Sequence, residues 1–451
     1  MSATNKDGMM ESIRTITTGF LGLGNIGAGV WRLIEQTRGE IAAREGVRFS
    51  VKRVLVRDTL KRRDVSVPKP ILTTDADDVL SDPDITLVVE ALGGEQPAAD
   101  YIRRALISGK SVVTANKLAL ATHWQELLET ACVSGSCLYF EPGVCGAIPV
   151  IRAITDSLQA NTIERLYGII NGTTNYILSQ MSAPYAGQGP APSAGGLSGQ
   201  CGVSYADALF EAQRLGLAEP DPTADVEGGD AACKLSILAT LAFRAHVPLE
   251  GLFRRGITTI TPVDVAYGRE LGYAIKLLAV AKRVGDKVEA RVHPTFVPLS
   301  HPLASVNGSL NAVYLYGHAC GELMFYGRGA GDAPTASAVV SDMIAAARSG
   351  CRGGERAYRM TGTVAMETDW VSRYFIRLQA VDQPGVLGAI AGILGRHGVS
   401  IASMRQTTGD GRAPLLFVTH MARESDVRSA LGEIDESLAA IENVIYVEEG
   451  I

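Results

Sequence analysis

The distribution of apolar and polar positions divides the chain into regions of different rhythm. Between residues 15 and 150, short apolar runs alternate with stretches in which apolar residues recur at helical spacing. Runs such as residues 85–92, ITLVVEAL, show no alternation between two faces, which is typical of strands buried on both sides of a parallel sheet. Strand and helix in turn therefore predict a doubly wound α/β domain over residues 15–150.

The rhythm changes between residues 151 and 328. Residues 165–178, RLYGIINGTTNYIL, predict a strand that runs into a helix. Residues 274–299 predict a hairpin that turns at Gly285 and Asp286. We expect a mixed α+β domain here, built mainly on an antiparallel sheet.

The remaining segments precede, connect or follow these two domains. Residues 1–14 predict a flexible leader, and residues 182–202, rich in Pro, Gly, Ala and Ser, predict a loop. Residues 329–352 are expected to pack back onto the first domain, and residues 353–372 to form a linker. Over residues 373–451 the order strand, helix, strand, strand, helix, strand predicts a ferredoxin-like βαββαβ module.

Composition narrows the class of partner. The formal net charge of −6 and the isoelectric point near 5.7 argue against a nucleic-acid or anionic-membrane surface and favour small metabolites. Residues 1–12 lack the apolar core of a signal peptide, and the longest uncharged apolar run, residues 235–243, is about half of a membrane span. No pair of the seven cysteines has CxxC spacing, so we expect reduced thiols and a cytoplasmic protein.

A glycine-rich turn predicts the nucleotide site. Residues 22–27, GLGNIG, lie between a predicted strand and a predicted helix, the context that the GxGxxG fingerprint requires. Gly22 permits the tight turn, Gly24 lets a pyrophosphate approach the backbone, and Gly27 lets the helix pack closely. The alternative is a turn without a ligand. The expected cofactor contacts are Phe20, Gly22, Gly24, Asn25, Ile26, Gly27, Arg57, Lys61, Gly93 and Lys117.

The end of the second strand bears on the choice of nicotinamide cofactor. Arg57 suits the 2′-phosphate of NADP, with Lys61 in support, whereas Asp58 keeps NAD as an alternative because a carboxylate there accepts ribose hydroxyls. Lys117 follows a later strand, at the sheet edge where such folds bind ligands. It is either a catalytic group or an ordinary helix-start residue.

An acidic segment precedes an apolar helix. Residues 218–234, AEPDPTADVEGGDAACK, carry five carboxylates and end on Lys234. Asp230 is a candidate helix N-cap, and Lys234 lies one turn later on the same face. Either the two residues serve catalysis, or they form a surface pair that contributes about 0.3–0.5 kcal/mol.

The spacing of residues 212–234 resembles the signature of homoserine dehydrogenases. The motifs GLGNIG, TANK, NGTTNYIL and GRGAGDAPTASAVVSD are similar to that family in the same order, over residues 15 to about 350. Residues 381–404, VDQPGVLGAIAGILGRHGVSIASM, resemble the start of an ACT domain.

The resemblance implies hydride transfer between NADP, or NAD, and the aldehyde carbon of L-aspartate 4-semialdehyde, which gives L-homoserine. It implies that Lys234 is the general acid/base, that Lys117 converges on the same oxygen, and that Asp230 orients Lys234. The residues it implies for the substrate are Glu219 and Asp225, which would bind the α-ammonium group, with Gly172 and Thr173.

The resemblance further implies a monovalent cation, expected to be sodium. The implied ligands are the Glu141 carboxylate and the backbone carbonyls of Val144, Gly146 and Ile148. Pro142 and Cys145 depart from the family's small-residue pattern there. The alternative is a rigid interdomain hinge.

For the C-terminal module the resemblance implies inhibition by L-threonine through residues 382–387, with a dimerisation or stability module that binds no ligand as the alternative. The family also implies that the α+β domain of residues 151–328 holds the substrate and contributes to dimerisation, and that the protein is a homodimer or homotetramer. Two other functions stay open: a dehydrogenase of another amino-acid semialdehyde, and an amino-acid-sensing regulator with an inactive Rossmann fold.

Overall fold

The computed structural model describes residues 13–183, 202–350, 360, 362, 364–407, 409 and 411–450. Most of the predicted leader, of the loop at 182–202 and of the first half of the linker lies outside the described residues. The chain forms two compact units. The first comprises Met1–Ile163, Ser236–Glu250 and Phe325–Thr363, and the second comprises Glu164–Leu235, Gly251–Met324 and Val364–Ile451.

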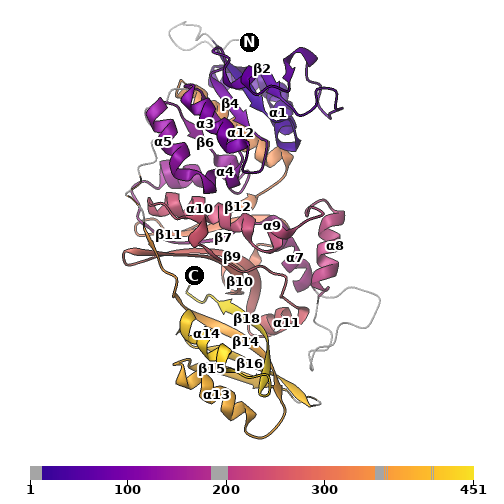
Figure 1. Cartoon of the computed structure of the whole chain (residues 1–451), viewed down its shortest axis with the longest axis vertical. Helices are drawn as coiled ribbons and strands as arrows, with labels where there is room; N and C mark the ends of the chain where they lie inside the picture. The colour runs from indigo at the N-terminus through magenta and orange to yellow at the C-terminus, as the bar shows by residue number, and fades with distance from the viewer. Residues whose placement is uncertain are drawn as a thin grey trace. The chain divides into compact units, whose positions relative to one another are not determined.

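The first unit is built on a six-stranded parallel sheet in the order β3-β2-β1-β4-β5-β6 (Figure 1). This is the strand order of a doubly wound dinucleotide-binding fold, so the predicted fold class is confirmed. The strands are β1 (Arg14–Leu21), β2 (Val47–Leu55), β3 (Leu72–Thr73), β4 (Leu87–Glu90), β5 (Ser111–Thr114) and β6 (Leu138–Tyr139). The prediction missed β3, which has only two residues and no apolar run of its own.

The helices of this unit pack their apolar stripes on the sheet. They are α1 (Asn25–Glu45), α2 (Asp77–Leu80), α3 (Ala98–Ile107), α4 (Lys117–Thr122), α5 (Trp124–Ser134), α6 (Val150–Arg152) and α12 (Asp332–Arg348). Helices α4 and α5 are separated by one residue, His123, at which the backbone leaves the helical region. Helix α12 joins the core cluster of α1, and a Cβ on Gly29 of α1 would lie 3.2 Å from the Asp332 carbonyl. Glycine therefore permits this close approach.

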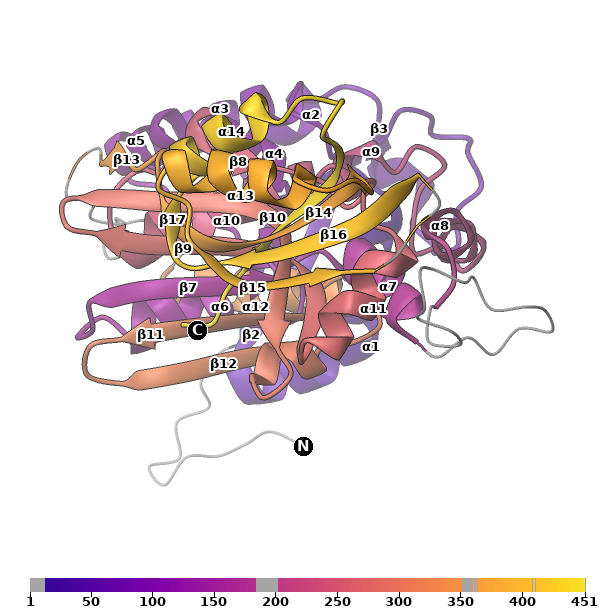
Figure 2. The same ribbon diagram turned by 90° about the horizontal axis from the view of Figure 1, so that it is seen from below.

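The second unit contains most of a twelve-stranded sheet whose main path runs β12-β11-β7-β9-β10-β18-β14-β16-β15 (Figure 2). Its first half comprises β7 (Ile163–Ile169), β9 (Tyr273–Val284), β10 (Lys287–Pro298), β11 (Leu310–Gly317) and β12 (Gly321–Arg328). The predicted hairpin is present: β9 and β10 pair antiparallel along their whole length, and Gly285 takes the positive φ of 62° that the turn requires. The helices here are α7 (Gly172–Ser182), α8 (Tyr205–Arg214), α9 (Thr223–Val226), α10 (Gly229–Phe243, which runs on into the first unit) and α11 (Pro262–Glu270).

The C-terminal module has the predicted βαββαβ order. It comprises β14 (Val371–Val381), α13 (Val386–Arg396), β15 (Ile401–Gln406), β16 (Arg412–Thr419), β17 (Ala422–Arg423), α14 (Glu424–Glu433) and β18 (Ala439–Val447). Two short strands, β8 (Phe253–Arg254) and β13 (Ala365–Met366), pair with β10 and were not predicted; β13 lies within the expected linker.

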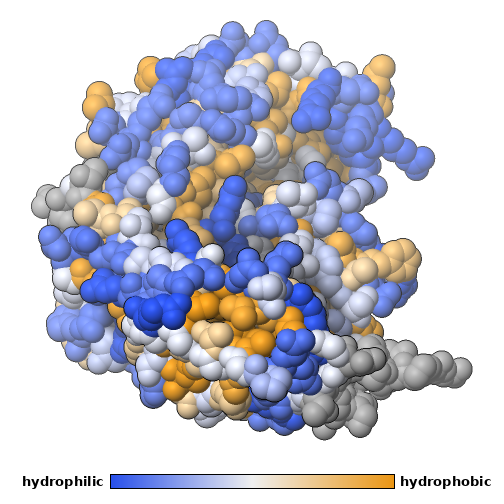
Figure 3. Space-filling model, turned by 60° about the horizontal axis from the view of Figure 1, so that its bottom comes forward, coloured by the Kyte–Doolittle hydropathy of each residue, from blue (hydrophilic) through white to orange (hydrophobic). Residues whose placement is uncertain are grey.

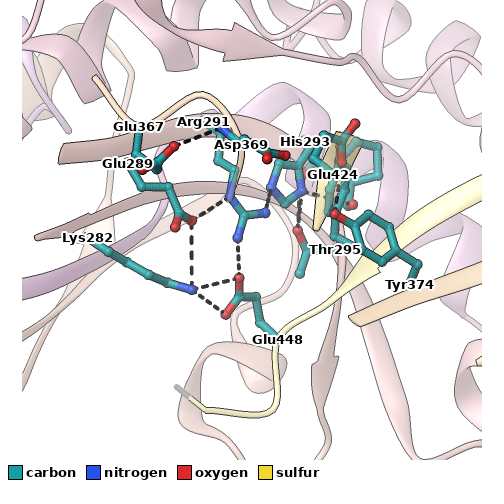
Figure 4. A network of polar contacts seen from close by, with 12 residues as sticks. Lys282, Glu289, Arg291, His293, Thr295, Glu367, Asp369, Tyr374, Glu424 and Glu448 are labelled. Carbon is teal, nitrogen blue, oxygen red and sulfur yellow. Dashed lines mark hydrogen bonds and ion pairs between the residues drawn. The ribbon is translucent and has the colours of Figure 1, made fainter. Parts of the chain in front are cut away.

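The sheet of the C-terminal module is continuous with the strands β7 and β9 to β12, because β18 pairs with β10. Strand β18 pairs parallel to β10 through Thr295↔Tyr446 and Phe296↔Val447. A buried charge cluster accompanies this pairing (Figure 4). Arg291, fully buried, donates to Glu289 Oε1 at 2.7 Å and to Glu448 Oε1 at 2.7 Å. We call the β10–β18 pairing and this cluster the seam.

No helix in the described part of the chain is long and apolar enough to cross a membrane.

Candidate active site

The glycine-rich turn of the first unit has the geometry of a phosphate-binding loop. Gly22 has φ +104°, and a Cβ there would lie 2.7 Å from the Ala91 carbonyl. A Cβ on Gly27 would lie 2.4 Å from the Gly22 carbonyl, whereas a Cβ on Gly24 would meet nothing within 4 Å. Gly24 is the N-cap of α1 and has no capping side chain. The space beside Gly24 therefore lies open at the start of α1, and a helix N-terminus favours an anion.

The remaining expected cofactor residues surround this turn in different ways. Phe20 is fully buried within the parallel sheet, whereas Asn25 is exposed and Ile26 is half-buried. Gly93 has φ +77° and open space around it.

The end of β2 carries Arg57, Asp58 and Lys61, all exposed. The Asp58 carboxylate accepts the backbone N–H of Leu60 at 2.7 Å, and its carbonyl accepts from Arg63 at 2.6 Å. Asp58 is thus engaged by its own loop, and its carboxylate closes a local turn.

The loops after β4 and β5 are tied together beside this edge. Glu90 is buried at the end of β4 and accepts from the Thr114 hydroxyl at 2.5 Å and from the backbone N–H of Leu92 at 2.8 Å. Asn116 donates to the Gly94 carbonyl at 2.6 Å and caps α4 by accepting from the Ala119 N–H. Lys117, half-buried, is the first residue of α4, so the loop that precedes it is held in place.

The second unit brings Asp230 and Lys234 together. Lys234 Nζ donates to Asp230 Oδ2 at 2.7 Å and to the Ile170 carbonyl at 2.9 Å. Both side chains are buried, with 8% of each residue exposed. The pair at i,i+4 is therefore not the solvated surface pair that the sequence left open.

The expectation that Asp230 is the N-cap of α10 is wrong. The helix begins at Gly229, and Ala232 already donates to the Gly228 carbonyl at 2.9 Å. Gly228, with φ +79°, makes the turn one residue before the helix begins. Asp230 is consequently in the first turn, where its carboxylate reaches along the helix to Lys234.

Asn171 joins this pair to Asp225. Its Nδ2 donates to Asp225 Oδ1 at 2.7 Å and to Asp230 Oδ2 at 2.8 Å. Burial raises the pKa of Asp225, the Asp230 charge raises it further, and the bond from Asn171 opposes both. Sequence reasoning missed Asn171, although it is the first residue of the NGTTNYIL motif; the structure shows that it is also the N-cap of α7.

The other expected substrate residues are Gly172 and Thr173 at the start of α7 and Glu219 in the segment between α8 and α9. Thr173 is buried and donates to the Leu217 carbonyl at 2.7 Å. A Cβ on Gly172 would lie 2.8 Å from the Ser309 carbonyl, so glycine is required there. Glu219 is exposed, and its backbone carbonyl accepts from Gln213 at 3.1 Å.

The expected cation loop surrounds Glu141, which is buried. Its carboxylate accepts the backbone N–H groups of Ile151 at 2.8 Å and Arg152 at 2.9 Å. Burial raises the pKa of Glu141 to about 7, and the neighbouring Asp342 contributes in the same direction. The turn that follows has positive φ at Cys145 and Gly146, 57° and 51°.

The fold and these sites define an NAD(P)-dependent oxidoreductase that carries a C-terminal ACT module. Models of the homoserine dehydrogenase NAD-binding domain, of homoserine dehydrogenase and of the ACT domain match residues 22–141, 149–344 and 374–438. The chain is 42% identical to the homoserine dehydrogenase of Mycobacterium tuberculosis, over 95% of this chain and 96% of that one. It is 38% identical to that of Bacillus subtilis, over 94% and 96%.

Solved structures agree. A homoserine dehydrogenase from Thiobacillus denitrificans superposes with a TM-score of 0.85 at 37% identity, covering 96% of this chain and 98% of that one. The enzyme of S. aureus gives a TM-score of 0.75 at 32% identity, covering 97% and 100%. The chain belongs to the homoserine dehydrogenase family, and the resemblance inferred from its motifs is confirmed.

Proposed function

We propose that this chain interconverts L-aspartate 4-semialdehyde and L-homoserine. The observation that carries the proposal is the buried Lys234–Asp230 pair, joined through Asn171 to the Asp225 carboxylate. In the reduction, a bound nicotinamide cofactor would supply the hydride to the aldehyde carbon, and Lys234 donates a proton to the carbonyl oxygen. A positioned acid of this kind increases the rate of the reaction by about 10²–10⁴-fold.

The remaining roles follow the chemistry of the substrate. Asp225 and Glu219 bind the α-ammonium group by charge-assisted hydrogen bonds. Gly172 leaves room at the start of α7, and Thr173 holds the adjoining loop. Lys117 acts from the edge of the parallel sheet as a second group for the reacting oxygen, and Asp230 orients Lys234.

We propose NADP as the preferred cofactor. Arg57 is exposed at the end of β2 and suits a 2′-phosphate, with Lys61 nearby in the sequence. Asp58, the group that would favour NAD, already binds the Leu60 amide. The GLGNIG turn with Phe20 and Gly93 would hold the dinucleotide.

A sodium ion is proposed beside Glu141. Among the described residues no three His, Cys, Asp or Glu side chains group as a metal site, so such a cation depends on carbonyls around one carboxylate. The carbonyls of Val144, Gly146 and Ile148 are the further ligands. The Ile148 carbonyl also accepts from Val150 at 2.8 Å, so it would be shared.

The wider role is likewise a proposal. The enzyme acts in the cytoplasm in the biosynthesis of threonine, methionine and isoleucine, as a homodimer or homotetramer. L-threonine inhibits it through residues 382–387 of the ACT module. Exposed apolar side chains such as Met404, 48% exposed on the edge strand β15, suit a partner copy. Figure 3 shows the face that it draws as a mixture of polar and apolar areas, with a large apolar patch in its lower part.

The test is the oxidation of NADPH, and separately of NADH, with L-aspartate 4-semialdehyde. Lys234→Met should lower kcat by about 10²–10⁴-fold, because it removes the proton donor. The protein should still fold, because methionine has a side chain of nearly the same length as lysine. The control is Lys287→Met, which removes an exposed lysine of β10. An unchanged kcat in Lys234→Met would contradict the role of Lys234.

The same assay separates the alternatives. Turnover of a different semialdehyde would identify another dehydrogenase, and nucleotide binding without any turnover would identify a regulator. The rate in sodium chloride compared with the rate in choline chloride tests whether a sodium ion is required. The rate with and without added L-threonine tests whether L-threonine inhibits the enzyme.

A further inference from the structure

The side-chain amide of Asn171 forms hydrogen bonds through both its oxygen and its NH₂ group, at the place where α7, α9 and α10 meet. Its Oδ1 accepts from the Thr174 backbone N–H at 2.8 Å and from the Thr174 hydroxyl at 2.9 Å. A backbone N–H can only donate, so the oxygen must face the helix and the NH₂ group must face the carboxylates. The orientation of the amide is therefore fixed by the cap of α7.

The fixed NH₂ group divides its two protons between two acids. One bond goes to Asp225 and the other to Asp230, so the two carboxylates share a single planar donor. Asp230 and Lys234, both on α10, are the charged groups that face Asp225. Without a donor between them, the two carboxylates would repel each other or share a proton.

The adjoining peptide holds the lysine. The carbonyl of Ile170, the residue before Asn171, accepts from Lys234 Nζ at 2.9 Å, and Lys234 also donates to the same Asp230 oxygen that Asn171 binds. The Ile170–Asn171 segment thus contacts the group proposed for proton transfer and both acids.

We propose that Asn171 is the positioning residue that fixes the ammonium-binding Asp225 relative to the proton-transferring Asp230–Lys234 pair. The inference rests on the proposed function, which gives these two ends of the site their roles. Asn171 acts through the acids and does not itself touch the reacting atoms.

The test is Asn171→Asp, which is nearly isosteric and keeps an acceptor to cap α7. It replaces the shared donor by a third carboxylate. Both ends of the site should suffer: kcat should fall about 10²-fold, because displacement of about 1 Å has that effect. The KM for L-homoserine and its dissociation constant by calorimetry should rise together, and the acid limb of kcat/KM should move to higher pH as Asp225 loses its donor.

The matched control is Ser204→Ala, which removes the cap of another helix in the same unit, the exposed Ser204–Asp207 contact of α8. It should change the melting temperature alone. If Asn171→Asp also changed only the melting temperature, leaving kcat, KM and the pH profile as in the wild type, the inference would be overturned.

Two further outcomes are decisive. If Asn171→Asp does not fold, Asn171→Ser, which keeps the cap and at most one donor, takes its place with the same expected pattern. A wild-type chain that fails to turn over L-homoserine overturns the proposed function and this inference with it. An active wild type with unchanged variants overturns the inference alone.

Discussion

Lys276 is a single ionisable residue in a place where burial disfavours its charged form. It lies on β9, is buried, and donates to Val306 O at 2.5 Å, Asn307 Oδ1 at 3.1 Å and Asn175 Oδ1 at 3.3 Å. Within the described parts of the chain no carboxylate forms an ion pair with it. Burial lowers the pKa of Lys276 to about 8.

This lowered pKa predicts a pH dependence of stability. Between about pH 8 and the ordinary lysine pKa, the unfolded chain binds more protons at Lys276 than the folded chain does, so the free energy of unfolding rises with pH. Lys276→Met should abolish this part of the rise, on the order of 1–3 kcal/mol. Urea unfolding at about pH 7.5 and pH 10 measures it. Lys287→Met should keep the wild-type dependence, and an equal dependence in all three proteins would refute the prediction.

At the scale of elements, the seam joins two strands that pair over only a short stretch. Burial alone would raise the pKa of Glu448, but Arg291 and Lys282 hold it below its usual range. Arg291, Lys282 and Glu448 lie among the strands in Figure 4. The carboxylate is thus the counter-ion of two buried or half-buried cations.

Glu448→Gln should therefore destabilise the protein by about 3–5 kcal/mol, because it leaves Arg291 buried with one partner fewer. Glu449→Gln, the neighbouring and exposed glutamate, should cost less than about 1 kcal/mol. Unfolding midpoints in urea compare the two. Equal midpoints would mean that the seam is held by its strand pairing and apolar contacts alone. The lowered pKa also implies that this stabilisation is lost as the pH falls into the acid range.

At the scale of the whole molecule, the continuous sheet means that β18 of the C-terminal module covers the edge of β10. Phe296 of β10 is fully buried, and its ring centroid lies 5.1 Å from that of Phe375 in β14. Helix α11 is fixed to the same module by Arg377, which donates to Asp264 at 2.7 Å. The module is therefore part of the core of the second unit as well as a candidate effector site.

A chain that ends at residue 363 should fold poorly, because it exposes the β10 edge, Phe296 and the Arg291 cluster. We expect a lower soluble yield and a broader unfolding transition than for a chain that lacks only residue 451. The first is measured as the amount of soluble protein after expression, and the second from a thermal unfolding curve. A truncated chain as stable as the longer one would show that β10 needs no cover.

Much of the fold and part of the site could be predicted from local pattern. The parallel sheet, the β9–β10 hairpin and the βαββαβ module follow from periodicity and turn residues, because each is encoded within a few tens of residues. Short strands such as β3, β8 and β13 could not be predicted, since two residues carry no period. The start of α10 was misplaced because the Gly228–Gly229 turn let the helix begin before Asp230.

The sequence by itself determined the family, the nucleotide-binding turn and the identity of Lys234 and Asp230 as candidate groups. Only the tertiary structure decided that this pair is buried, that Asn171 joins it to Asp225, and that Glu141 and Asp342, 201 residues apart, lie together. It alone decided that Arg291 and Glu448, 157 residues apart, form the buried ion pair of the seam. Such contacts depend on which segments the packed core brings into contact, and that choice is made by the chain as a whole rather than by any local run of residues.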